Sequence, residues 1–165
     1  MLTALQRQLI YFPSKAPADV LSELASRMGL QTWRDNAGEA IGWKSPGDPN
    51  ARYRMLVFHG NAGYALNRDY FVTGLRARGS QWDVFLFEYP GYGARKGTPS
   101  EVNFKATATQ ALEVFLAIDS RPVFITGESL GSGVASFLAS TFPNDVAGLL
   151  LVTPFSSLGD VGAHH

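Results

Sequence analysis

The amino-acid sequence predicts a single α/β domain with a mainly parallel β-sheet and helices on both faces. Four apolar runs of strand length alternate with segments whose apolar residues recur every three or four positions. Each run is apolar throughout, so its strand must be covered on both sides, and helices in right-handed crossovers between parallel strands supply that cover. A chain of 165 residues is of the usual size for one domain, here residues 1–165.

The elements are expected in a regular order along the chain. Residues 31–34 and 40–44 are expected to form an antiparallel pair, followed by a loop rich in proline and glycine at residues 45–50. The four apolar runs that follow are residues 55–58, 84–87, 123–126 and 146–152. The three helices expected between these runs lie around residues 66–75, 101–115 and 134–138.

Composition excludes several classes of function. Lys plus Arg and Asp plus Glu both number 14, so there is no basic field for nucleic acid. The absence of cysteine excludes disulfides, thiolate zinc sites and a cysteine nucleophile. The three histidines show no ligand spacing, so we expect no metal and no cofactor.

The sequence predicts a cytoplasmic protein, because neither a signal peptide nor a membrane-spanning run is seen. Near the N-terminus, Leu2, Leu5, Leu9 and Ile10 share one helical face. We expect that face to pack on the core of the domain rather than to contact a membrane.

Three glycine-containing turns follow the apolar runs. They cover residues 59–63, 89–93 and 127–133. Ligands of open parallel sheets bind at the carboxyl ends of the strands, where these turns are expected. The functional residues are therefore sought in the three turns.

The third turn contains the pattern G-x-S-x-G at residues 127–131. This pattern is typical of a nucleophile elbow, in which a serine occupies a strained turn between a strand and a helix. Glycine is needed two residues to either side, because a side chain there would collide with the neighbouring strand or helix. The alternative is that Ser129 simply caps the following helix.

The first turn supplies what a serine nucleophile needs next. Acyl transfer builds negative charge on the former carbonyl oxygen, which two backbone N–H groups can stabilise. The candidate donors of this oxyanion hole are the amides of Leu130 and Asn61. For His59, which ends the preceding strand, we favour a role in bracing the loop over that of a general base.

Five motifs in this order resemble the α/β-hydrolase superfamily of serine hydrolases, in its alpha/beta-hydrolase-domain branch. The motifs are residues 9–13, 59–63, 89–93, 97–101 and 127–131. The resemblance implies that Ser129 is the nucleophile and that Asn61 and Leu130 form the oxyanion hole. It also implies an esterase or thioesterase that acts on small acyl esters or thioesters through an acyl-enzyme.

The rest of the catalytic triad is the open question. In this superfamily an acid and then a histidine follow the serine. Downstream of Ser129 the acids are Asp145 and Asp160, and the histidines are His164 and His165. One interpretation is an incomplete α/β-hydrolase fold, the N-terminal portion of a longer one, that lacks its last strands and with them the base and acid. The other is a triad in which Asp160 and His164 or His165 act in the same chain or across an oligomer interface.

Self-association is expected through residues 146–152 or the adjacent face. Without a further strand, that run would expose unpaired amides and apolar side chains.

There are two alternatives to the serine hydrolase function. One is a catalytically weak or inactive core that acts only as a binding or self-associating module. The other is a nucleotide-binding domain, which is disfavoured because no G-x-G-x-x-G follows the first apolar run.

Overall fold

The computed structural model describes residues 11–79 and 81–154, which form one six-stranded sheet in the order β1-β2-β4-β3-β5-β6. The strands are β1 (Gln31–Arg34), β2 (Ala40–Lys44), β3 (Tyr53–Phe58), β4 (Trp82–Phe87), β5 (Val123–Glu128) and β6 (Gly148–Val152). β1 pairs with β2, and β2 with β4, in antiparallel fashion, whereas the other pairs are parallel. The predicted mainly parallel sheet and its antiparallel start are both confirmed.

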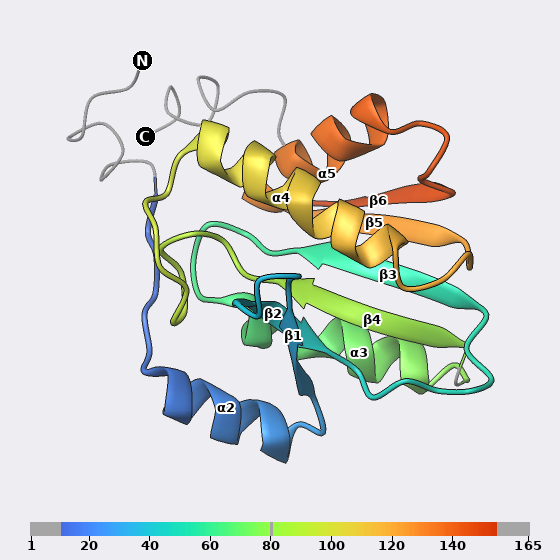
Figure 1. Ribbon diagram of the computed structural model, residues 1–165, viewed down its shortest axis with the longest axis horizontal. Helices are drawn as coiled ribbons and strands as arrows, with labels where there is room; N and C mark the ends of the chain where they lie inside the picture. Colours follow the sequence, from blue (N-terminus) through green and yellow to red (C-terminus); the bar gives the residue numbers. More distant parts are fainter. Residues whose placement is uncertain (1–10, 80, 155–165) are drawn as a thin grey trace.

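Helices cover both faces of the sheet, as predicted (Figure 1). They are α2 (Ala18–Arg27), the 3₁₀ turn η1 (Ala65–Arg68), α3 (Asp69–Arg76), α4 (Glu101–Leu116) and α5 (Leu130–Thr141). In Figure 1, α4 and α5 lie on one side of the sheet, and α2 and α3 lie on the other. The side chain of Ser100 accepts a hydrogen bond from the Asn103 amide, which fixes the start of α4 where the sequence indicated it.

The apolar runs of β3 and β4 are buried because each contributes to two separate cores. In β3, Leu56 and Phe58 belong to the core beneath α4 and α5, whereas Met55 and Val57 belong to the core beneath α2 and α3. Successive side chains of a strand point to opposite faces, so a strand covered on both sides needs apolar residues at every position.

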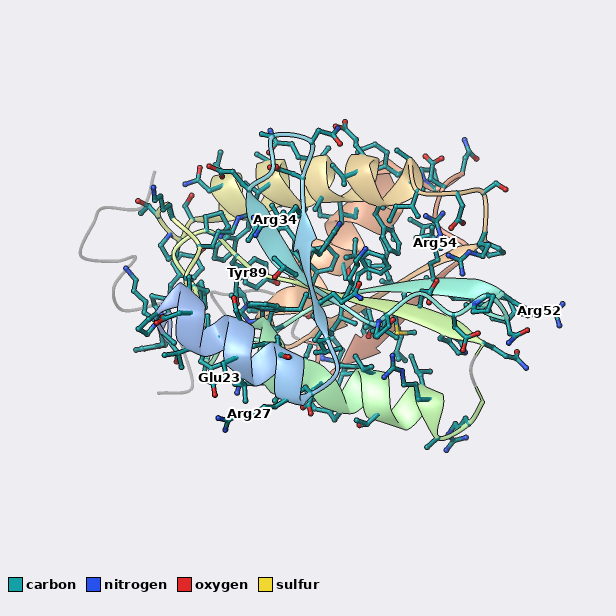
Figure 2. The ribbon with its side chains drawn as sticks, turned by 60° about the horizontal axis from the view of Figure 1, so that its bottom comes forward. Glu23, Arg27, Arg34, Arg52, Arg54 and Tyr89 are labelled. Atoms are coloured by element: carbon teal, nitrogen blue, oxygen red, sulfur yellow. The ribbon has the colours of Figure 1, made fainter. Side chains whose placement is uncertain are left out.

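The carboxyl ends of the central strands meet at one edge of the sheet. Phe58 pairs with Phe87 on one side and with Gly127 on the other, so the turns that follow these three strands start side by side. In Figure 2, Tyr89 and Arg54 lie toward opposite ends of the strands. The candidate site is at the Tyr89 end.

β6 lies at the edge of the sheet, paired with β5 alone among the described strands. Leu149 is 41% exposed and Leu150 is 50% exposed. Among the described residues, β6 therefore presents the exposed apolar side chains that the sequence led us to expect. Within the described residues, no helix is both long and apolar enough to cross a lipid bilayer.

Candidate active site

Ser129 occupies a strained backbone conformation between β5 and α5. Its φ of 49° and ψ of −116° fall in a region that residues other than glycine rarely adopt. Such strain persists only where the surrounding structure enforces it, and it concentrates at functional sites. The residue as a whole is half-buried.

The two glycines of the motif make this turn sterically feasible. A Cβ atom on Gly127 would lie 2.2 Å from the carbonyl oxygen of Gly131, and one on Gly131 would lie 2.1 Å from that of Phe58. Both distances are far inside van der Waals contact, and in both cases the obstructing atoms are backbone. The predicted collision with the neighbouring strand and helix is therefore confirmed.

Hydrogen bonds hold the backbone of Ser129 on both sides. Its amide donates to the carbonyl oxygen of Val152 at 2.9 Å. Its own carbonyl oxygen accepts from the amide of Ser132 at 2.8 Å and from the hydroxyl of Ser132 at 2.5 Å. Ser129 occupies the N-cap position of α5, but its side chain makes no capping hydrogen bond there, which counts against the alternative that it serves only as a helix cap.

The loop after β3 is fixed through the side chain of Asn61. Its Oδ1 accepts from the amide of Phe12 at 3.1 Å and from the hydroxyl of Tyr92 at 2.9 Å. The second bond ties the first glycine turn to the turn after β4. Burial raises the pKa of Tyr92, so its hydroxyl remains a donor throughout the ordinary pH range.

His59 braces this loop, as predicted, and does not serve as a free base. It is 1% exposed. Its Nδ1 donates to the carbonyl oxygen of Gly60 at 2.7 Å, and its Nε2 lies 3.0 Å from Oε1 of Glu88. Both ring nitrogens are engaged by these groups. The Glu88 carboxylate also accepts from the amide of Ala65, which anchors the start of η1.

A charged cluster not anticipated from the sequence lies directly beside the elbow. Nε and Nη2 of Arg68 each donate to the carboxylate of Glu128 at 2.9 Å, and the hydroxyl of Tyr70 donates to it at 2.6 Å. Burial raises the pKa of Glu128, but hydrogen bonds from Arg68 and Tyr70 and the charge of Arg68 outweigh it, and the net shift is downward. Burial and the bond to Glu128 raise the pKa of Tyr70 to about 12.

The candidate acid and base residues separate into two groups. Asp160, His164 and His165 lie outside the described residues. Asp145 follows the end of α5, whereas Ser129 directly precedes its start. Twelve helical residues span about 18 Å at 1.5 Å each, so Asp145 is not beside the nucleophile.

An apolar groove of about 560 Å³ opens between α4 and α5, next to the elbow. It is lined mainly by Tyr11, Phe104, Leu130, Val134 and Phe137. Leu130 directly follows Ser129, so the groove starts one residue from the candidate nucleophile. Among the residues that the structure describes, no three His, Asp or Glu side chains are grouped to hold a metal ion.

Comparison with known proteins agrees with this geometry. The family profile described as alpha/beta hydrolase fold matches residues 53–162. An uncharacterized protein of Mycobacterium tuberculosis is 37% identical over 170 residues, covering 97% of this chain and 57% of the relative. Human alpha/beta hydrolase domain-containing protein 17B is 35% identical over 112 residues, covering 66% of this chain and 38% of the relative. The chain thus spans little more than half the length of the mycobacterial relative.

Two solved structures illustrate the similarity of fold. An alpha-beta hydrolase from Vibrio vulnificus superposes with a TM-score of 0.66 at 21% identity, covering 99% of this chain and 68% of that one. A soluble variant of monoglyceride lipase from Saccharomyces cerevisiae, in complex with a substrate analog, gives a TM-score of 0.58 at 19% identity. That match covers 76% of this chain and 45% of the lipase.

Proposed function

The chain belongs to the alpha/beta hydrolase fold family, and on that premise we propose that it is a serine hydrolase of the esterase or thioesterase type. The observation that carries the proposal is the backbone of Ser129 at φ 49°, in a turn flanked by two glycines whose positions tolerate no side chain. A structural turn would not need a serine in this conformation, because glycine adopts it without strain. The similarity to the yeast lipase supports an ester as substrate.

In the proposed reaction, Oγ of Ser129 attacks the acyl carbon of a small ester or thioester while a base accepts its proton. The amides of Asn61 and Leu130 stabilise the negative oxygen of the tetrahedral intermediate. The alcohol or thiol then leaves with the proton, and water hydrolyses the acyl-enzyme. Loss of one oxyanion-hole donor typically costs about 3 kcal/mol of transition-state stabilisation.

The base is proposed to come from outside the described residues, because His59 is engaged by Gly60 and Glu88. Within this chain, the candidates are His164 or His165, with Asp160 as the acid. The same residues of a second copy are the alternative. A serine hydroxyl without a positioned imidazole is a poor nucleophile, so turnover depends on this contribution.

A second candidate function is a self-associating core with weak or no catalysis. The exposed side chains of Leu149 and Leu150 on the edge strand β6 favour it. Its signature would be an oligomeric, folded protein that hydrolyses esters no faster than solvent does.

The two functions are separated by fluorophosphonate labelling and turnover of short-chain p-nitrophenyl esters. Ser129→Ala is compared with Ser26→Ala, which removes an exposed serine of α2. A serine hydrolase loses both signals in Ser129→Ala and keeps them in Ser26→Ala. Equal labelling of all three proteins would remove Ser129 from the mechanism.

A further inference from the structure

We propose that Arg68 is a positioning residue that holds the loop of residues 60–63 in register with the nucleophile elbow. The proposal rests on the proposed function, because it concerns the distance between the amide of Asn61 and Ser129. Arg68 touches neither of these groups directly. It acts through Ala62 on one side and Glu128 on the other.

On the elbow side, Arg68 binds Glu128, the residue that precedes the nucleophile. Its Nε and Nη2 each donate to a different oxygen of Glu128, at 2.9 Å. A bidentate guanidinium–carboxylate pair fixes orientation as well as distance, which a lysine ammonium does not. The side chain of Arg68 is 11% exposed and that of Glu128 23%, so solvent screens the pair only in part.

On the loop side, the same guanidinium lies against the backbone. Nη1 of Arg68 donates to the carbonyl oxygen of Ala62 at 3.1 Å. A Cβ atom on Gly60 would lie 3.1 Å from Nη2, and one on Gly63 would lie 3.1 Å from Nη1. The glycines on both sides of Asn61 thus let the guanidinium approach the loop closely.

Two anchors therefore lie directly after the amide of Asn61 in the loop. Phe12 and Tyr92 hold the side chain of Asn61, and Arg68 holds the carbonyl of the next residue, Ala62. Without Arg68 the first anchor remains, but the hydrogen bond to Ala62 is lost, and with it this link between the loop and Glu128. A misplacement of about 1 Å in a catalytic group can cost about a hundredfold in rate.

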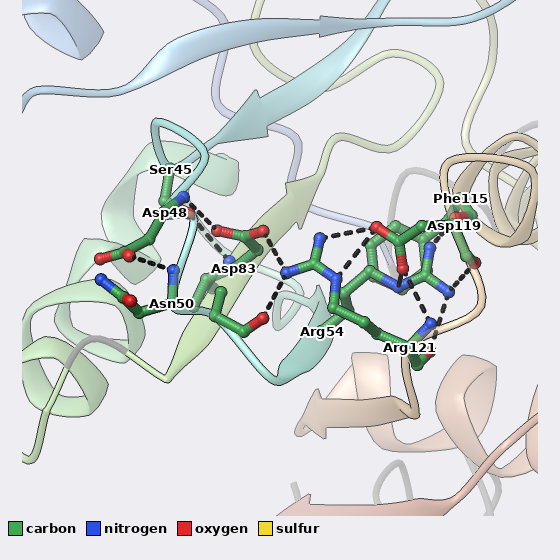
Figure 3. Close-up of polar contacts among 10 residues, drawn as sticks. Ser45, Asp48, Asn50, Arg54, Asp83, Phe115, Asp119 and Arg121 are labelled. Atoms are coloured by element: carbon green, nitrogen blue, oxygen red, sulfur yellow. Dashed lines mark hydrogen bonds and ion pairs between the residues drawn. The ribbon is translucent and has the colours of Figure 1, made fainter.

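The network at the opposite end of the sheet provides a matched control (Figure 3). There, Nη1 of Arg121 lies 2.8 Å from the carboxylate of Asp83, and Nη2 lies 2.7 Å from that of Asp119. Arg121 precedes β5, whereas Glu128 ends it. Loss of Arg121 removes both of these ion pairs without touching the candidate site.

The test compares Arg68→Met, Arg68→Lys and Glu128→Gln with Arg121→Met in the full chain. The first readout is the second-order rate of fluorophosphonate labelling at Ser129. The second is hydrogen–deuterium exchange of the amides of residues 60–63, measured on protein that is folded by circular dichroism.

If Arg68 positions the loop, Arg68→Met slows labelling about 10- to 100-fold and accelerates hydrogen exchange in residues 60–63. Arg68→Lys restores less than half of the loss, because it lacks the fork. The double variant Arg68→Met/Glu128→Gln labels no more slowly than the slower single variant, since both remove one unit. In turnover of p-nitrophenyl esters, kcat falls and KM is retained. Arg121→Met labels at the wild-type rate.

Two results would overturn the proposal. One is unchanged exchange in residues 60–63 of Arg68→Met. The other is an equal fall in labelling in Arg68→Met and Arg121→Met, which would reflect lost stability alone. If the wild-type protein does not label at all, the proposed function fails, and the exchange measurement still decides whether Arg68 holds the loop.

Discussion

At the scale of single residues, Ser129 carries a conformational cost that its neighbours offset. A residue other than glycine at positive φ, as Ser129 is, stores about 1–3 kcal/mol of strain. The bonds from Ser129 to Val152 and Ser132 keep it there. The strain is useful if the hydroxyl must project from the turn.

Replacing Ser129 by glycine should therefore stabilise the fold while it abolishes fluorophosphonate labelling. We expect the free energy of unfolding in urea to rise by about 1 kcal/mol, because glycine adopts this conformation freely. Ser129→Ala is the control, since it removes the hydroxyl but keeps the strain. Equal stability of the two variants would show that the turn is not strained.

Asp119 should make a pH-dependent contribution to stability. Hydrogen bonds from Arg121 and the charges of Arg54 and Arg121 outweigh burial and lower its pKa from 3.8 to about 2. A lowered pKa stabilises the fold above the unfolded value, and the contribution is lost as the pH falls from about 4 to 2. Asp119→Asn should thus cost about 1 kcal/mol at pH 7, allowing for solvent screening.

Urea denaturation of both proteins at a series of pH values checks this. The difference between wild type and Asp119→Asn should shrink as the pH falls toward 2. A difference that is constant from pH 7 to 2 would mean that the Asp119 charge does not contribute.

At the scale of elements, the junction of β5 and α5 depends on close backbone contact. Gly131 lies in the first turn of α5, and a Cβ atom there would meet backbone atoms of Phe58 and His59. Gly133 lies in the same helix with open space around its ideal Cβ position. The two glycines differ in what surrounds them and not in secondary structure.

Gly131→Ala should be strongly destabilising, by about 3 kcal/mol, because the backbone of β3 or α5 must move. Gly133→Ala should be neutral or stabilising by about 0.5–1 kcal/mol, since alanine is the better helix former. Thermal unfolding of the two variants tests this. A similar melting temperature for both would contradict the packing described for the elbow.

Local signals made the strands and the elbow predictable. The steric requirement of the elbow depends on the five residues of the G-x-S-x-G pattern. The apolar runs predict strands covered on both sides. Helix α2 was missed, although its apolar residues, Leu21 and Ala25 among them, face the core at helical spacing. The pair of Arg68 and Glu128 joins residues 60 positions apart, and only the fold brings them together.

At the scale of the whole molecule, chemistry and support are separated along the strands. The strained serine and the two glycine loops occupy the carboxyl ends of the central strands. The network of Arg54, Asp83, Asp119 and Arg121 occupies the other end (Figure 3). Substitutions at one end should therefore change activity and those at the other end stability, which is why variants of Arg68 and Arg121 are compared.

The edge strand β6 leads us to propose self-association of the whole molecule. Leu150→Lys should shift the protein toward monomer in analytical ultracentrifugation at micromolar concentrations, because charge on an open edge opposes pairing. Val102→Lys, which changes a residue that is 73% exposed on α4, is the control and should leave the distribution unchanged. A wild-type protein that is monomeric throughout this range would contradict the proposal.

The central claim concerns where the backbone amides point relative to Ser129. The most direct measurement is a crystal structure of the protein after fluorophosphonate treatment. The account predicts a phosphonyl group on Oγ of Ser129, with its oxygen about 2.7–3.1 Å from the amide nitrogens of Asn61 and Leu130. An adduct on another residue, or a phosphonyl oxygen turned away from both amides, would contradict it.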